Sequence, residues 1–118
     1  MFAILLRQAG YQVEYLGPDI PLSDLIEYAD EQQPNMVILS ATTESSGAEL
    51  LGVGKKLGRM RVPPIFAYGG RAYSAYTALR QKMDGVFLGG EFATALNQVH
   101  DLLKTVRVAP VRRPVMYV

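Results

Sequence analysis

The sequence of 118 residues contains no cysteine and a single histidine, His100. Without cysteine the chain can form no disulfide, no thiolate metal site and no cysteine nucleophile. His100 lies on the last predicted helix, past its midpoint and away from the strand ends, and a histidine near a helix C-terminus is typical of a surface or half-buried position. Asp19 and Glu44 could form an acid and base pair, but they lie on predicted loops with no third group, so we interpret them as surface acids. We therefore expect neither a metal ligand nor a catalytic residue in the chain.

The sequence has no large excess of positive or negative charge and no long apolar run. Twelve basic and eleven acidic residues give a net charge of +1, which provides no electrostatic footprint for nucleic acid or for an anionic membrane. The apolar stretch in residues 1–7 is far shorter than the ~18–20 residues of a spanning helix, and it lacks a basic leader. We therefore expect a cytoplasmic chain with no membrane partner and no direct nucleic-acid binding.

The hydrophobic residues, 49% of the chain, are enough for one domain with a sizeable core. They fall into segments that alternate between the period of a helix and the runs of a strand. The predicted strands are 11–16, 36–39, 65–68 and 86–88, and the predicted helices are 2–9, one from Ser23 or Asp24 to before Pro34, about 48–60, 71–82 and about 91–105. Short connections favour an α/β fold, a flavodoxin-like doubly wound parallel sheet.

This series lacks a first strand, because the sequence opens in a helix. In a flavodoxin-like sheet of order 2-1-3-4-5 that strand is central. After a domain of residues 1–105, residues 106–118 form an extended C-terminal tail with strand-like ends. The tail is either an arm on the surface or on a neighbouring chain, or a strand in the vacant central position, supplied by the same chain or by a partner. Pro110 and Pro114 argue against a long central strand.

Two loops of small residues follow the predicted strands 36–39 and 65–68. Ser40-Ala41-Thr42 ends the first strand, Gly69-Gly70 ends the second, and 26 residues separate the two loops. The carboxyl ends of neighbouring parallel strands form the edge at which open α/β sheets bind ligands. Two structural alternatives remain, a Ser40 hydroxyl that caps the following helix and a tight strand-to-helix turn at the two glycines.

The segment Gly52-x-Gly54-Lys55-Lys56-Leu57-Gly58 has the composition of a phosphate-binding loop. It lacks the residue order of that motif, and it is predicted to lie inside a helix and not at a helix start. We interpret its glycines as small residues that face a packed neighbour.

Four pieces of the sequence together resemble the cobalamin-binding domain of methionine synthase, corrinoid methyltransferase carriers, mutases and MerR-type cobalamin-dependent regulators. They are Leu5-Leu6-Arg7-Gln8-Ala9-Gly10-Tyr11, Tyr15-Leu16-Gly17-Pro18-Asp19-Ile20-Pro21, Ser40-Ala41-Thr42 and Gly69-Gly70. The family pattern places Ser-x-Leu before Gly-Gly at a spacing that the gap here matches. The resemblance covers residue 1 to about residue 104, and it is closest to the MerR-type regulators.

The resemblance implies that the ligand is cobalamin and that its nucleotide tail passes between the strand ends. The residues that would contact the tail are Ser40, Thr42, Gly69 and Gly70, while Gly17, Gly89 and Gly90 would line the same edge. Glycine lets the backbone approach a ligand with no Cβ atom in the way. A serine hydroxyl can form a hydrogen bond to a ring nitrogen or a phosphate.

The sequence departs from the family pattern where the cobalt ligand is expected. By the family spacing, the Asp-x-His-x-x-Gly segment that carries the lower cobalt ligand should end a few residues before Met1. The resemblance therefore implies a shortened domain with impaired cobalt ligation. Thr42 replaces the usual leucine, and the carboxylate of Glu44 would repel a phosphate unless it turns outward.

These observations predict a cobalamin-binding module of a transcriptional regulator or a corrinoid carrier. The module is not an enzyme by itself and forms a homodimer. The alternative is a degenerate, cofactor-free domain that acts as a dimerisation or protein-interaction element, with the tail exchanged between subunits. Titration with hydroxocobalamin distinguishes the two.

Overall fold

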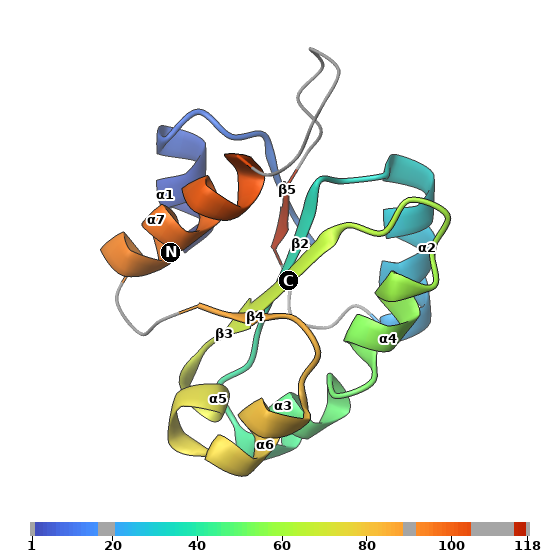
Figure 1. Ribbon diagram of the computed structural model, residues 1–118, viewed down its shortest axis with the longest axis vertical. Coiled ribbons are helices and arrows are strands. Elements are labelled where there is room, and N and C mark those ends of the chain that lie inside the picture. Colours follow the sequence, from blue (N-terminus) through green and yellow to red (C-terminus); the bar gives the residue numbers. More distant parts are fainter. Residues whose placement is uncertain (1, 17–20, 89–91, 105–114, 118) are drawn as a thin grey trace.

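The structure is a computed structural model, which describes residues 2–16, 21–88, 92–104 and 115–117. Helices and strands alternate along these residues (Figure 1). The elements are α1 (Phe2–Gln8), β1 (Val13–Tyr15), α2 (Leu22–Gln32), β2 (Met36–Ser40), α3 (Glu44–Glu49), α4 (Val53–Gly58), β3 (Ile65–Gly69), α5 (Arg71–Ala75), α6 (Thr77–Lys82), β4 (Val86–Phe87), α7 (Phe92–Lys104) and β5 (Val115–Tyr117).

The five strands form one parallel sheet in the order β1-β5-β2-β3-β4. The last strand of the chain therefore lies near the centre of the sheet, between the first two strands. Val115 is in register with Val13 on one side and with Met36 on the other. This arrangement confirms the flavodoxin-like fold. Of the alternatives for the tail, the arm on the surface or on a neighbouring chain is wrong for residues 115–117, which fill the vacant position within one chain. The strand is only three residues long, as expected directly after Pro114.

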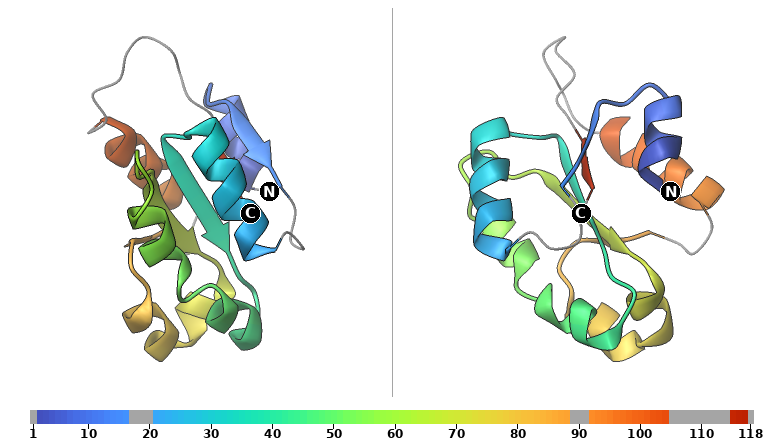
Figure 2. Two further views of the ribbon diagram at one scale, coloured as in Figure 1. Left: turned by 90° about the vertical axis from the view of Figure 1, so that its right-hand side faces the viewer. Right: turned by 180° about the vertical axis from the view of Figure 1, so that it is seen from behind.

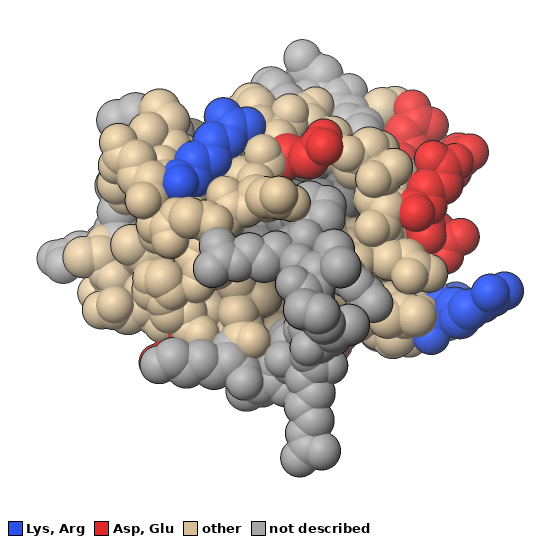
Figure 3. All heavy atoms as spheres, turned by 90° about the horizontal axis from the view of Figure 1, so that it is seen from above, with Lys and Arg blue, Asp and Glu red and all other residues tan. Residues whose placement is uncertain are grey.

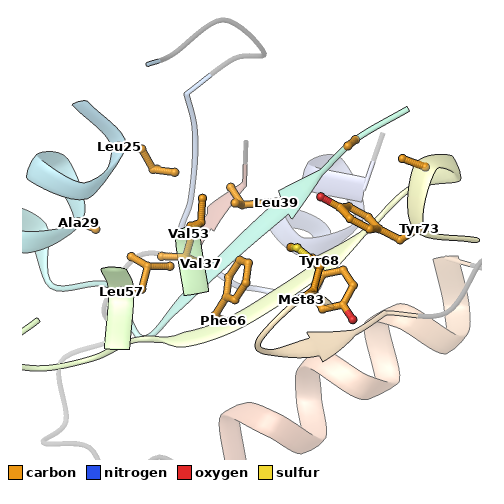
Figure 4. Close-up of a cluster of buried hydrophobic side chains, with 12 residues drawn as sticks. Leu25, Ala29, Val37, Leu39, Val53, Leu57, Phe66, Tyr68, Tyr73 and Met83 are labelled. Atoms are coloured by element: carbon orange, nitrogen blue, oxygen red, sulfur yellow. The ribbon is translucent and has the colours of Figure 1, made fainter. Parts of the chain in front are cut away.

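Helices cover both faces of the sheet, as a doubly wound fold requires. Figure 2 shows α1 and α7 on one side and α2 and α4 on the other. Because successive strand residues point to opposite faces, β2 contributes to two cores. Val37 and Leu39 pack with residues of α2 and α4 (Figure 4), whereas Met36 and Ile38 pack with residues of α1 and α7.

Two predicted helices are each divided in the structure. The expected helix 48–60 is replaced by α3 and α4, which are separated by a turn at residues 50–52, and α3 begins earlier because Thr43 caps it. Glycine is a poor helix former, and four glycines between residues 47 and 58 account for the break. The expected helix 71–82 is divided at Tyr76, whose backbone leaves the helical region (φ −115°, ψ 88°).

The glycine-rich segment of residues 52–58 has a packing role. The segment begins a helix and does not lie in the interior of a longer one as predicted, because Gly52 is the N-cap of α4. The interpretation of a close neighbour holds for Gly54, where a methyl group would lie 2.8 Å from both the Cβ atom and the carbonyl oxygen of Asp84. It is wrong for Gly52 and Gly58, where a methyl group would meet no described atom within 4 Å. Gly54 therefore lets α4 pack closely against the turn that precedes β4.

The helices of the described residues are too short or too polar to cross a membrane.

Candidate functional site

The two small-residue loops meet at the carboxyl edge of the sheet. Ser40, the last residue of β2, is in register with Gly69, the last residue of β3. The Ala41 N–H donates a hydrogen bond of 3.2 Å to the Gly69 carbonyl oxygen, so the pairing continues beyond β2. The Ala72 N–H then donates to the Ala41 carbonyl oxygen at 3.1 Å. The structure thus places the Ser40 and Gly69 loops side by side, at the position where parallel sheets bind ligands.

Gly70 is required by the chain itself. Its φ of +101° belongs to a region that residues with a side chain rarely adopt. A methyl group at this position would lie 2.4 Å from the Ala41 carbonyl oxygen and 2.9 Å from Ser40 Oγ. Gly70 therefore provides the tight turn from β3 into α5, which was the structural alternative for the two glycines.

Gly69 has no such internal requirement. It is buried, but its φ is not positive. Among the described residues, the closest atoms to a methyl group placed there would be the carbonyl oxygen and Cβ of Leu88, at 3.5 and 3.6 Å, which is ordinary van der Waals contact. The described part of the fold would accept alanine at residue 69. Of the two neighbouring glycines, the described fold therefore requires only Gly70.

The Ser40 hydroxyl is available for a ligand. Ser40 is half-buried, and its Oγ forms no hydrogen bond to any other described residue. It does not cap the next helix, because Thr43 has that role: Thr43 Oγ1 accepts a hydrogen bond of 3.2 Å from the Ser46 N–H. The capping interpretation of Ser40 is therefore wrong, and the hydroxyl adjoins the Gly70 backbone at the sheet edge.

The other predicted site residues are less constrained by the structure. Thr42 is exposed at the same edge. Glu44 is also exposed and lies in the first turn of α3, where a carboxylate interacts favourably with the helix dipole. Gly17, Gly89 and Gly90 lie outside the described residues.

Tyr73 ties together the two helices that follow the loops, a role that the sequence did not reveal. Its side chain is fully buried, and its hydroxyl donates a hydrogen bond of 3.0 Å to the Gly47 carbonyl oxygen in α3. Its ring packs edge-on against Tyr68 with centroids 4.9 Å apart. In an unbroken helix over residues 71–82, Tyr76 would share a face with the buried Ala72, but Tyr76 is 44% exposed. The division of the helix at Tyr76 accounts for this exposure.

Removal of the Tyr73 hydroxyl should loosen this connection. Tyr73→Phe is expected to lower the free energy of unfolding by about 1–2 kcal/mol, the effect of losing a buried neutral hydrogen bond. Urea unfolding followed by circular dichroism measures the change. Tyr76→Phe is the matched control, because its exposed ring should give no measurable loss.

The same variant should also change the alkaline stability. Burial raises the pKa of Tyr73 to about 12, above the value near 10 of an unfolded chain. Between these values the unfolded chain binds fewer protons, so stability falls as the pH rises. Tyr73→Phe should show a shallower fall between pH 10 and 12. Tyr28, whose pKa a hydrogen bond to Glu14 also raises to about 12, remains in both proteins. Equal slopes would contradict the assignment.

His100 lies away from this edge. Its Nδ1 atom shares a hydrogen bond with the hydroxyl of Tyr11, a residue that precedes β1 and so lies at the amino end of the sheet. The two rings are also in contact, with centroids 5.2 Å apart. Within the described ranges, no three His, Asp or Glu residues gather as a metal site would need.

Comparison with family models identifies the chain. The model described as the B12 binding domain matches residues 1–102, most of the chain and both loops. The chain belongs to the B12-binding domain family. Searches of curated proteins and of solved structures give no significant match. The B12-binding match ends before β5, so the strand near the centre of this sheet comes from residues beyond the family's pattern.

The geometry of the edge fits the nucleotide tail of cobalamin, the ligand for which the B12-binding family is named. The tail needs close approach to backbone and a polar group beside it. Gly69 is buried, and its described neighbours leave room for a side chain, so they do not explain why glycine stands there. Ser40 provides a hydroxyl that no other described residue uses. Both residues end adjacent strands and therefore lie within one small area.

Proposed function

We propose that this chain is a cobalamin-binding module that holds the nucleotide tail of the cofactor at the edge formed by Ser40, Gly69 and Gly70. One observation carries the proposal. At Gly69 the described fold would accept a side chain, and yet glycine stands there beside a hydroxyl with no described partner. A ligand that packs against the Gly69 backbone supplies the missing reason for the glycine.

Each residue of the edge has a separate role in this proposal. The Ser40 hydroxyl forms a hydrogen bond with the tail, and Gly69 lies against it. Gly70 shapes the turn and keeps the Ser40 loop in place, and Thr42 contacts the exposed part of the tail.

We further propose that the chain contributes no imidazole to the cobalt. The 118 residues contain no Asp-x-His-x-x-Gly segment, and His100 is engaged with Tyr11 at the opposite end of the sheet. Bound cobalamin supplies organometallic chemistry, which a separate catalytic or regulatory domain would use. In this proposal the module is part of a regulator, with the MerR-type branch preferred, or of a corrinoid carrier.

Titration with hydroxocobalamin tests the proposed function. We expect a change in the visible spectrum of the cofactor and co-elution of cofactor and protein in gel filtration. A folded protein that gives neither result would contradict cobalamin binding. It would favour the second candidate, a cofactor-free interaction element.

Substitution of Ser40 tests the proposed contact. Ser40→Ala should weaken cobalamin binding about tenfold, which corresponds to about 1.4 kcal/mol, the scale of one hydrogen bond. The stability of the protein should not change, because the hydroxyl has no described partner to lose. Ser45→Ala, at an exposed position on α3, is the control and should bind as the wild type does. Equal affinities for both variants would exclude Ser40 as a contact.

A further inference from the structure

Two neighbouring helices carry opposite charges on their exposed sides. We call the acidic residues of α2 the acidic stripe; they are Asp24, Glu27, Asp30 and Glu31, with no lysine or arginine on this helix. We call the basic residues of α4 and the turn after it the basic stripe; they are Lys55, Lys56, Arg59 and Arg61, with no acidic residue among positions 53–61. All eight side chains are exposed.

The two stripes share one side of the molecule. Leu25 and Ala29 of α2 pack in the same core as Val53 and Leu57 of α4, so the helices cover the same face of the sheet. Seen from above, acidic side chains gather on the side where these helices lie, with basic side chains next to them (Figure 3). The two stripes therefore form a single surface with a negative half and a positive half.

The charged side chains of this surface have no polar partner among the described residues. No hydrogen bond or ion pair joins any of the eight groups to another described residue. The acidic stripe repeats at helical spacing, since Asp24, Glu27 and Glu31 stand at i, i+3 and i+7. Like charges at this spacing repel one another and destabilise the isolated helix. A partner of opposite charge would relieve the repulsion in both stripes.

We propose that this surface binds a second copy of the chain in a two-fold symmetric dimer. A two-fold axis between α2 and α4 brings the acidic stripe of each copy against the basic stripe of the other. Such an isologous interface requires one self-complementary patch, which the paired stripes provide. A purely acidic or purely basic partner would satisfy one stripe and oppose the other. The net charge of +1 also leaves little overall repulsion between two copies.

Charge reversal in two separate variants tests the dimer. The first variant carries Glu27→Lys, Asp30→Lys and Glu31→Lys, and the second carries Lys55→Glu, Lys56→Glu and Arg59→Glu. In sedimentation velocity, the wild type should approach twice its 13.0 kDa mass at low salt. Each variant alone should associate about 100-fold more weakly than the wild type. An equimolar mixture of the two variants should dimerise again, because each then meets its complement.

Salt provides the second measurement. Raising the ionic strength from about 0.1 M to 1 M shortens the screening length to about 3 Å and should weaken wild-type association about tenfold or more. The proposal is overturned if the wild type stays at 13.0 kDa up to about 1 mM protein. It is also overturned if the variants dimerise as well as the wild type, or if the mixture does not dimerise. If a triple variant is not folded by circular dichroism, the single variants Glu27→Lys and Lys56→Glu repeat the test with the same outcomes.

Discussion

Replacement of Met116 by proline should detach β1 from the rest of the sheet. Met116 is the central residue of β5, in register with Glu14 of β1 and Val37 of β2. Proline cannot donate a ladder hydrogen bond and is not tolerated in the middle of a sheet. Among the described strands, β1 pairs with β5 alone. We therefore expect Met116→Pro to lower the free energy of unfolding by about 2–4 kcal/mol, the range of a large backbone effect that leaves a strand carbonyl unpaired.

The loss of stability should begin in β1. In amide hydrogen exchange, the amides of Val13–Tyr15 should lose protection first, while those of β2 and β3 keep most of theirs, because those two strands pair directly. Met116→Ala retains the backbone donor and is the control. If the alanine and proline variants unfold at the same urea concentration, the backbone pairing of β5 is not what holds β1.

The two neighbouring glycines should respond in opposite ways to alanine. Gly70→Ala forces a side chain into a backbone conformation of φ +101° and places its methyl group 2.4 Å from the Ala41 carbonyl oxygen. We expect a loss of about 3 kcal/mol in the free energy of unfolding. Gly69→Ala meets ordinary contacts, so its loss should stay under about 1 kcal/mol. Urea unfolding of the two variants measures the difference.

At Gly69, alanine should affect cobalamin binding more than it affects stability. The added methyl group of Gly69→Ala, in contact with Leu88, narrows the space beside the proposed tail. Affinity should therefore fall about tenfold or more while stability is nearly retained. Loss of affinity in a stable Gly69→Ala variant would separate a ligand role from a folding role. Unchanged affinity would mean that the cofactor does not lie against residue 69. In that case the glycine would remain without a described reason.

The ligand edge was predictable because it depends on short, strong signals. Continuous apolar runs at residues 36–39 and 65–68 indicate buried parallel strands, and the small residues that follow them end adjacent strands. The position of β5 was one of the alternatives that topology allowed, since the sheet needed a strand near its centre. Pattern and topology together therefore located the edge at which the two loops meet.

Other features depend on contacts that the sequence does not encode locally. The sequence predicts one helix over residues 71–82, whereas the structure divides it at Tyr76, buries Tyr73 against Gly47 and leaves Tyr76 exposed. The difference between Gly69 and Gly70 rests on one backbone angle and on the nearby carbonyl oxygen of Ala41. Neither follows from residue type, because the partner in each case lies in a distant segment of the chain, Gly47 in α3 or Ala41 after β2.

The position of β5 also sets the order in which the fold can be completed during synthesis. Val13 pairs with Val115, so the first strand must wait for almost the entire chain before its neighbour exists. Until then, β1 lacks its partner strand and one edge of β2 is unpaired. Pairings between such distant residues form slowly, and exposed edges favour aggregation. A chain that stops short of residue 115 should therefore be more prone to aggregation than one that includes residues 115–117.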